Sequence, residues 1–271
     1  MHPILVELGP WRILTHDAFT VLALAVGLAL YYRDLRRRGW LDPTIVAISV
    51  AAIAGALIGA RLVTAWEHLE YYTAMDGMPL TAAIEHSGKS LIGALAGGYV
   101  ATALAKRAAG YTRSTGDAYL LAIPVATAIG RIGCFLSELP LGTPTDLPWG
   151  MTVSAEAAAA FARCPGCDLP MHPSMLYEIG FNVIAALVIV RYRDRVTVPG
   201  DGLRLYLLAA AIFRFLVEFV RGNEPQALGL TGPQWVLIPL IGLLIVHFVR
   251  QWRRGAYAVP PAPVPIPLGG T

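Results

Sequence analysis

Seven runs of mostly apolar residues divide this chain, and they restrict what it can fold into more than any other feature. A helix needs about 20 such residues to cross the hydrocarbon core of a bilayer. Lipid offers no hydrogen-bond partner to the backbone, so a crossing segment must be helical. Only 14% of the residues are charged, against about 25% in a soluble domain. We therefore predict an all-α, polytopic membrane helix bundle with seven transmembrane helices, at residues 17–32, 43–65, 89–105, 117–136, 174–190, 202–220 and 233–249.

The basic residues outside the runs predict how the bundle is oriented. Fourteen of the 21 Lys and Arg residues lie in the segments that follow the first, third, fifth and seventh runs, counting Arg204 at the edge of the sixth run. Loops rich in Lys and Arg stay in the cytoplasm. An odd number of spans puts all four segments on one side, with the N-terminus outside and the C-terminus cytoplasmic. The net charge of +3 gives no reason to expect nucleic acid as a partner.

The remaining sequence suggests one domain and a tail. Residues 1–256 are expected to form a single transmembrane domain, and residues 257–271 a Pro-rich, disordered cytoplasmic tail. No basic stretch or cleavage site precedes the first run, so we expect that run to act as the insertion signal. Cys164 and Cys167 form a lone CxxC, which lacks the second half of a zinc site. They fit a small disulfide or two free thiols in an outer loop.

Five basic residues lie within or at the outer end of a predicted span, and four glutamates lie at similar depth. A charge there costs at least about 2.5–3.5 kcal/mol, so it should face the bundle interior with a partner. One interpretation is interhelical ion pairing. The other is an anion site, because the planar guanidinium group binds phosphate in a bidentate manner and lipid headgroups supply phosphate at this depth. The residues are Arg61, Lys89, Arg131, Arg214 and Arg221, with Glu67, Glu138, Glu178 and Glu218.

Within the sixth run, Arg214, Glu218 and Arg221 occupy positions i, i+4 and i+7, which share one helix face. A salt-bridged pair of Arg214 with Glu218 that only orders the helix is the simpler alternative to a binding role. In the third run, Gly93 and Gly97 are suited to close helix packing.

Several short motifs, taken in order, resemble the prolipoprotein diacylglyceryl transferase family. None is specific alone, but their order extends the resemblance over residues 15–250. They are Gly-Ala-Arg-Leu at 59–62, Ser-Gly-Lys-Ser-Leu-Ile-Gly at 87–93, Gly-Arg-Ile-Gly-Cys-Phe at 130–135, His-Pro-Ser-Met-Leu-Tyr-Glu at 172–178, and Phe-Arg-Phe-Leu-Val-Glu-Phe-Val-Arg at 213–221.

The resemblance implies an enzyme and a reaction. Members of this family move a diacylglyceryl group from phosphatidylglycerol to the lipobox cysteine thiol of a prolipoprotein. They work among the membrane lipids at the outer leaflet of the bacterial plasma (inner) membrane, as multi-pass proteins without metal or soluble cofactor. By resemblance, Arg131 and Arg214 match the two arginines on which the family depends. Gly142 matches a required glycine, and Glu218 and Arg221 match the charged residues after the second arginine.

The chain departs from the family pattern at the groups that would move protons. Ile92 stands at the family histidine, with His86 nearby, and Cys134 replaces an asparagine. Leu139 stands at a family glutamate, with Glu138 one residue away. No residue of the first span clearly matches the family tyrosine. The anion-binding half of the site is thus retained and the acid/base half is altered.

The site residues that we predict follow from this division. Arg131, Arg214 and Glu138 are expected to be catalytic. The acceptor thiol must become a thiolate, so a base must lie within hydrogen-bond reach. Glu138, His86 and His172 are the candidates; His172 could instead be an ordinary helix start, and Cys134 a packing residue rather than a reactive thiol. The expected substrate-binding residues are Lys89, Gly142, His172, Tyr177, Glu218 and Arg221, although Tyr177 also fits an interfacial aromatic belt.

Two further functions remain open. The first is a related phospholipid-dependent transferase with another acceptor. The second is a membrane protein without chemistry, either a transporter or a lipid-binding scaffold. A transporter would be expected to have an inverted repeat and charges along a pathway through the membrane. The sequence shows no such repeat, and its intramembrane charges gather at one end.

Overall fold

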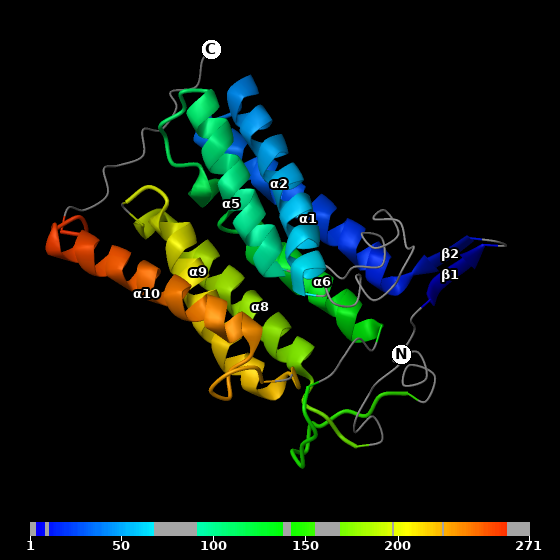
Figure 1. The fold of residues 1–271 in the computed structure, drawn as a ribbon. Helices are drawn as coiled ribbons and strands as arrows, with labels where there is room; N and C mark the ends of the chain where they lie inside the picture. The colour runs from blue at the N-terminus through cyan, green and yellow to red at the C-terminus, as the bar shows by residue number, and fades with distance from the viewer. Residues whose placement is uncertain are drawn as a thin grey trace. The chain divides into compact units, whose positions relative to one another are not determined.

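A computed structural model describes residues 4–8, 11–67, 91–137, 142–154, 169–196, 198–223 and 225–258. Within these ranges each of the seven predicted segments contains an α-helix, and Figure 1 shows all of them. The helices are α1 (Thr15–Arg38), α2 (Pro43–Glu67), α5 (Leu91–Ala108), α6 (Ala122–Leu136), α8 (Ser174–Tyr192), α9 (Asp201–Val217) and α10 (Gly232–Arg253). Short 3-10 helices occupy η1 (Gly116–Tyr119), η2 (Arg193–Arg195) and η3 (Glu218–Val220).

The helices are apolar and long, as a membrane protein requires. Among the described residues, five segments are long and apolar enough to cross a bilayer, and no more than 28% of the most apolar 18-residue stretch of each is buried inside the protein. Their outward side chains therefore suit a lipid environment. They are α1, Pro43–Leu62 of α2, Gly116–Leu136 across η1 and α6, α8 and α10. The chain is thus a helical protein with several candidate membrane spans; α9, with 17 residues, is shorter than these.

An antiparallel hairpin precedes α1 and adds a small β element to the predicted all-α bundle. Strand β1 (Ile4–Leu8) pairs with β2 (Trp11–Leu14), with Ile4 opposite Leu14. Strands of 5 and 4 residues are too short to show a clear alternating pattern in the sequence.

One compact unit, Leu35–Arg113, is built on the contact between α2 and α5. Glycines bring the two backbones together. A Cβ atom on Gly59 would lie 2.3 Å from the carbonyl oxygen of Gly93, and one on Gly97 would lie 2.2 Å from that of Gly55. Small residues allow this approach where no hydrophobic effect drives helices together. The predicted packing role of Gly93 and Gly97 is confirmed.

The second unit, Met1–Asp34 with Ser114–Thr271, contains α6, α8, α9 and α10 and most of α1. Helix α6 packs on α8, and α9 packs on α10. The polar side chain of Asn182 is buried in this unit, where it donates to the carbonyl oxygen of Glu178 (2.8 Å) and accepts from the Tyr206 hydroxyl (2.8 Å). Both bonds satisfy an amide that would otherwise be costly to bury.

Helices α9 and α10 run antiparallel and are tied together at both ends (Figure 1). Asp201, at the start of α9, contacts His247 near the end of α10. Glu218, just after α9, contacts Thr231, which precedes α10. Asp117 of η1 caps the start of α9, since its carboxylate accepts from the backbone N–H groups of Gly200 and Leu203.

Candidate active site

Three chain segments meet at the Glu218 end of α9, and backbone hydrogen bonds hold them together. The N–H of Gly142 donates to the carbonyl oxygen of His172 (2.7 Å), and the N–H of Thr143 donates to that of Val220 (2.9 Å). A Cβ atom on Gly142 would lie 1.9 Å from the Val220 oxygen and 2.9 Å from the Cβ of His172. Any other residue at position 142 would force the segments apart. Gly142 therefore sets the spacing between the start of α8 and the residues that follow α9.

The carboxylate of Glu178, on α8, bridges two arginines from different segments. Its Oε2 forms an ion pair with the Nε of Arg131 on α6, and its Oε1 accepts from the Nη1 of Arg221 at 2.6 Å. Glu178 is buried, with 4% of its surface exposed. A buried carboxylate with one cation on each oxygen holds both guanidinium groups in a defined position.

Glu218 organises the other half of the cluster. Its Oε2 forms an ion pair with Arg214, four residues earlier, which is the pair that the spacing offered as an alternative to a binding role. Its Oε1 accepts from the side chain of Asn223 and, at 3.1 Å, from the hydroxyl of Thr231. Glu218 is 2% exposed, so all of these contacts lie inside the protein.

The two halves form one electrostatic unit with an excess of positive charge. Arg214 interacts electrostatically with Arg131 and Arg221 and with both glutamates. Three guanidinium groups against two carboxylates leave one positive charge. The arginine side chains are each 20% exposed, whereas the carboxylates are 5% and 0% exposed. The acids are therefore turned inward and the cations are accessible, which is the arrangement that an anion site needs.

A cavity of about 340 Å³ opens beside Glu218. Thr143, Asn223 and Thr231 also line it, so it lies between the segment after Gly142 and the start of α10. Its volume is in the range of sites that hold small molecules. Polar hydrogen-bonding groups and Glu218 of the cluster thus border a space that can hold part of a ligand, whereas none of the three arginines lines it.

Next to the cluster, His172, Tyr177 and Trp149 form a chain of hydrogen bonds. The indole N–H of Trp149 donates to the Tyr177 hydroxyl at 2.8 Å, and the same hydroxyl lies 3.1 Å from the Nδ1 of His172. Indole can only donate, so the tyrosine oxygen accepts there. When the Nδ1–H of His172 also donates to Tyr177, its Nε2 carries the lone pair and can accept a proton.

The structure brings most of the predicted site residues together. Arg131, Arg214, Glu218 and Arg221 form the cluster. Gly142 and His172 adjoin it through Val220, and Tyr177 directly precedes Glu178. The predictions for Lys89, Glu138 and His86, and for Cys164 and Cys167, lie outside the described residues.

Sequence reasoning missed several contributors. Glu178 was recognised as a charge at the right depth, but its bridging role depends on three elements that are distant in the chain. Asn223 and Thr231 carry no signal of their own beyond the capping box that Thr231 forms with Gln234. Cys134 packs beside the buried cluster of Val153, Met171 and Met175, and its sulfur lies 3.7 Å from the Nδ1 of His16. That position agrees with a packing cysteine.

A helical bundle with membrane-spanning segments, holding a buried and electropositive arginine–glutamate cluster, defines a membrane protein with a site suited to an anionic group. Residues 3–250 match the family model of prolipoprotein diacylglyceryl transferase, and the chain belongs to this family. The match covers every element of the candidate site.

Curated relatives are similar to this chain over most of their length. The chain is 31% identical to a phosphatidylglycerol–prolipoprotein diacylglyceryl transferase of Rhodospirillum rubrum, over 95% of both proteins. It is 30% identical to the protein of the same name from Cupriavidus metallidurans, over 93% of this chain and 94% of the relative. A further protein of that name, from Bifidobacterium longum subsp. infantis, is 27% identical over 92% of this chain and 84% of the relative.

Proposed function

We propose that this protein transfers a diacylglyceryl group from phosphatidylglycerol to the lipobox cysteine thiol of prolipoproteins, at the outer leaflet of the bacterial plasma membrane. The observation that carries the proposal is the cluster of three arginines held by two buried glutamates, in a chain whose relatives bear that activity in their names. The cluster supplies the group that such a reaction needs most, a preorganised set of donors for a phosphate.

The orientation of the protein follows from its basic segments. We place the N-terminus outside and the C-terminus in the cytoplasm, with seven spans. Basic residues lie in or just after the last turns of α8 and α10, at the ends of these helices that are far from the arginine–glutamate cluster; among them are Arg191, Arg195, Arg250 and Arg253. Under the positive-inside rule that cluster is then on the outer side. Phosphatidylglycerol and the lipobox of the incoming protein meet there.

On the donor side, Arg131 and Arg214 bind the phosphate of phosphatidylglycerol. Glu178 and Glu218 hold the two guanidinium groups in place before substrate arrives, so little reorganisation is needed during the reaction. The charge of the phosphate grows as it leaves. Each donor aimed at that growing charge contributes about 3–4 kcal/mol to stabilising the transition state.

The bond changes balance in a single displacement. The thiolate sulfur of the acceptor forms a bond to the glyceryl carbon that carries the phosphate, and the bond from that carbon to the phosphate oxygen breaks. The products are a diacylglyceryl thioether and glycerol phosphate. The electron pair of the broken bond stays on the phosphate oxygen, beside the arginines.

The thiol proton requires an acceptor, and His172 is the group that we propose. Its Nδ1 is engaged by Tyr177, which Trp149 in turn holds in position. In the tautomer whose Nδ1–H donates to Tyr177, Nε2 carries the lone pair and can take the proton. In this way a histidine from the start of α8 replaces the histidine that the family carries in its third span.

Transfer in a purified system tests the proposal. The full-length protein in detergent is incubated with phosphatidylglycerol and a lipobox peptide, and both the peptide mass and the release of glycerol phosphate are followed. A peptide with serine in place of the lipobox cysteine is the control. Mass gain by the cysteine peptide alone, with one glycerol phosphate released per modified peptide, is expected.

Other outcomes would count against specific parts of the proposal. Glycerol phosphate without modified peptide would mean another acceptor. Neither product, under conditions in which a known transferase works, would refute the transferase function. Full activity in a His172→Asn variant would exclude His172 as the base, since loss of a general base costs about 10²–10⁴ in rate.

A further inference from the structure

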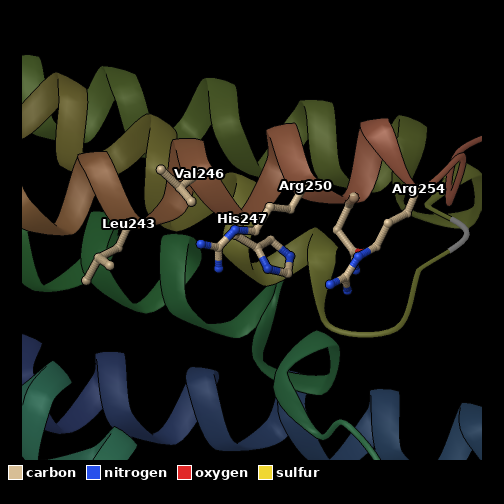
Figure 2. A pocket seen from close by; sticks show the side chains of 6 residues that line it. Leu243, Val246, His247, Arg250 and Arg254 are labelled. Atoms are coloured by element: carbon tan, nitrogen blue, oxygen red, sulfur yellow. The ribbon is translucent and has the colours of Figure 1, made fainter.

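A second cavity, an open groove on one exposed face of α10, lies at the other end of this helix from the candidate active site. It has a volume of about 280 Å³ and is lined by residues that recur every three or four positions along one face of the helix. Figure 2 shows Leu243, Val246, His247, Arg250 and Arg254, and Gln251 completes the lining. The two arginines and the histidine lie beside one another along the cavity (Figure 2).

Asp201, the acid that contacts His247 of this cavity, does not pair with its two arginines. Asp201 of α9 is buried, and its Oδ1 accepts from the Nε2 of His247 (2.8 Å) and the Nη1 of Arg204 (2.7 Å). Its Oδ2 accepts from the Tyr257 hydroxyl at 2.6 Å. Both oxygens are therefore occupied. Among the residues that the structure describes, Arg250 and Arg254 form no ion pair.

The cavity changes from apolar to cationic along the helix. Leu243 and Val246 line its first part, and Arg250, Gln251 and Arg254 line the rest. At about 1.5 Å per residue, the change takes place over roughly 6–12 Å. Trp252, on the same stretch of α10, is 78% exposed, which is typical of the water–lipid interface. The order is that of a phospholipid, with an acyl chain followed by a phosphate.

We propose that this cavity binds the headgroup of an anionic phospholipid, with the phosphate between Arg250 and Arg254 and an acyl chain against Leu243 and Val246. Two guanidinium groups can share the phosphate oxygens, and cationic pockets beside membrane helices retain anionic lipids in this way. The site lies about 25 Å along α9 from Glu218, so it is separate from the donor site. The proposal does not depend on the transferase function.

Lipid titration with paired variants tests the site. Full-length protein in detergent is titrated with short-chain phosphatidic acid, and the bound lipid is counted by native mass spectrometry. Phosphatidylcholine is the neutral-headgroup comparison. The test variant is Arg250→Gln with Arg254→Gln. The matched control, Arg191→Gln with Arg253→Gln, removes the same charge from exposed positions that do not line the cavity.

The test variant should raise the apparent dissociation constant of one phosphatidic acid by about tenfold to thirtyfold, as expected for two arginine contacts. The control should change it by less than about threefold. Binding at the candidate active site is common to all three proteins and does not affect the comparison. An equal loss of affinity in both variants would mean that the lipid is held only by general electrostatic attraction to the protein, and would overturn the proposed site. Displacement of the lipid by inorganic phosphate alone, or equally tight binding of phosphatidylcholine, would overturn the lipid assignment.

Discussion

The α9–α10 pair carries a charged cluster at each end, and the two clusters use similar residues for different purposes. At the Glu218 end, two carboxylates are shared among three arginines, whose side chains remain partly exposed. At the Asp201 end, one buried carboxylate receives three donors, from Arg204, His247 and Tyr257. The first cluster carries one more positive charge than its carboxylates neutralise. In the second, the carboxylate is saturated and ties α9 to α10.

The difference shows that the ratio of donors to acceptors says more than the presence of buried charge. A saturated carboxylate contributes to stability, because removing a partner leaves an unpaired group in a medium of low dielectric constant. A cluster with excess, accessible cations is suited to a ligand. Each of the following variants changes one end of the pair and is compared with a change at the other end or at a neutral position.

The largest difference is expected between two single variants, each of which removes one arginine from one end of the pair. Arg131→Gln leaves Glu178 paired with Arg221 but removes a hydrogen-bond donor that is proposed to bind the phosphate. The rate of transfer should therefore fall by about 10²–10³-fold. Arg204→Gln leaves Asp201 bound to His247 and Tyr257, and the rate should stay within about threefold of the unmodified protein. The transfer assay measures both. Similar losses in the two variants would mean that the clusters are not functionally distinct.

A methyl group at Gly142 should have the next largest effect. In Gly142→Ala the new Cβ meets the backbone at Val220, so the segment carrying Arg221 must move. We expect transfer to fall by at least about tenfold, with a loss of about 1–3 kcal/mol in stability from overpacking. Gly180→Ala is the control, because nothing lies within 4 Å of a Cβ at that position in α8. It should leave activity unchanged and stabilise the helix by up to about 1 kcal/mol.

Thermal unfolding in detergent, together with the transfer assay, distinguishes the two glycine variants. An active and stable Gly142→Ala protein would show that the three segments are not held at the spacing described above.

At the opposite end, Asp201→Asn should affect stability and not the reaction. The amide keeps the shape of the carboxylate but cannot accept three hydrogen bonds of the same strength. The free energy of unfolding should fall by about 1–3 kcal/mol. Activity per folded molecule should not change, as measured by transfer normalised to the fraction that remains monodisperse on size exclusion. A loss of activity without a loss of stability would show that the Asp201 end influences the site at the Glu218 end, which the contacts described above do not predict.

The smallest effect concerns the pH range in which the hydrogen bond between Tyr257 and Asp201 is kept. Partial burial of the phenol and its hydrogen bond to Asp201 raise the pKa of Tyr257 to about 12, from 10.0. Because the folded-state pKa is the higher one, the stability from this bond is fully present below pH 10 and is lost as the pH rises through about 12. The ultraviolet difference titration between the protein and its Tyr257→Phe variant should show one phenol ionising near pH 12. Ionisation near pH 10 would mean that the bond does not form.

Hydropathy predicted the helices well, since lipid leaves the backbone no alternative within an apolar run. The prediction placed the start of α8 at Ser174 and that of α2 at Pro43, as observed. The clustering of Arg131, Arg214 and Arg221 was also foreseeable, because a charge within a span must face inward. The i, i+4 spacing offered the ion pair of Arg214 with Glu218 as an alternative to a binding role, and the structure contains this pair.

Pairing between distant segments could not be predicted in the same way. Arg221 shares a helix face with Glu218 in the sequence pattern, but in the structure it pairs with Glu178, 43 residues away. That choice depends on how α8 packs and on the change from α9 to the tighter η3. Likewise, the saturation of Asp201 by His247 and Tyr257 follows from the antiparallel pairing of α9 and α10, which no local pattern encodes.

The length of α9 has a consequence for the surrounding membrane. Its two charged clusters begin at Asp201 and Glu218, about 25 Å apart along the helix, whereas a typical hydrocarbon core is about 30 Å thick. In the proposed arrangement of seven spans, an upright α9 is still shorter than the hydrocarbon core, so the bilayer must thin around this helix for polar headgroups to reach both clusters. We then expect a donor lipid to enter slightly below its usual plane, so that membrane thickness affects how readily the proposed reaction starts.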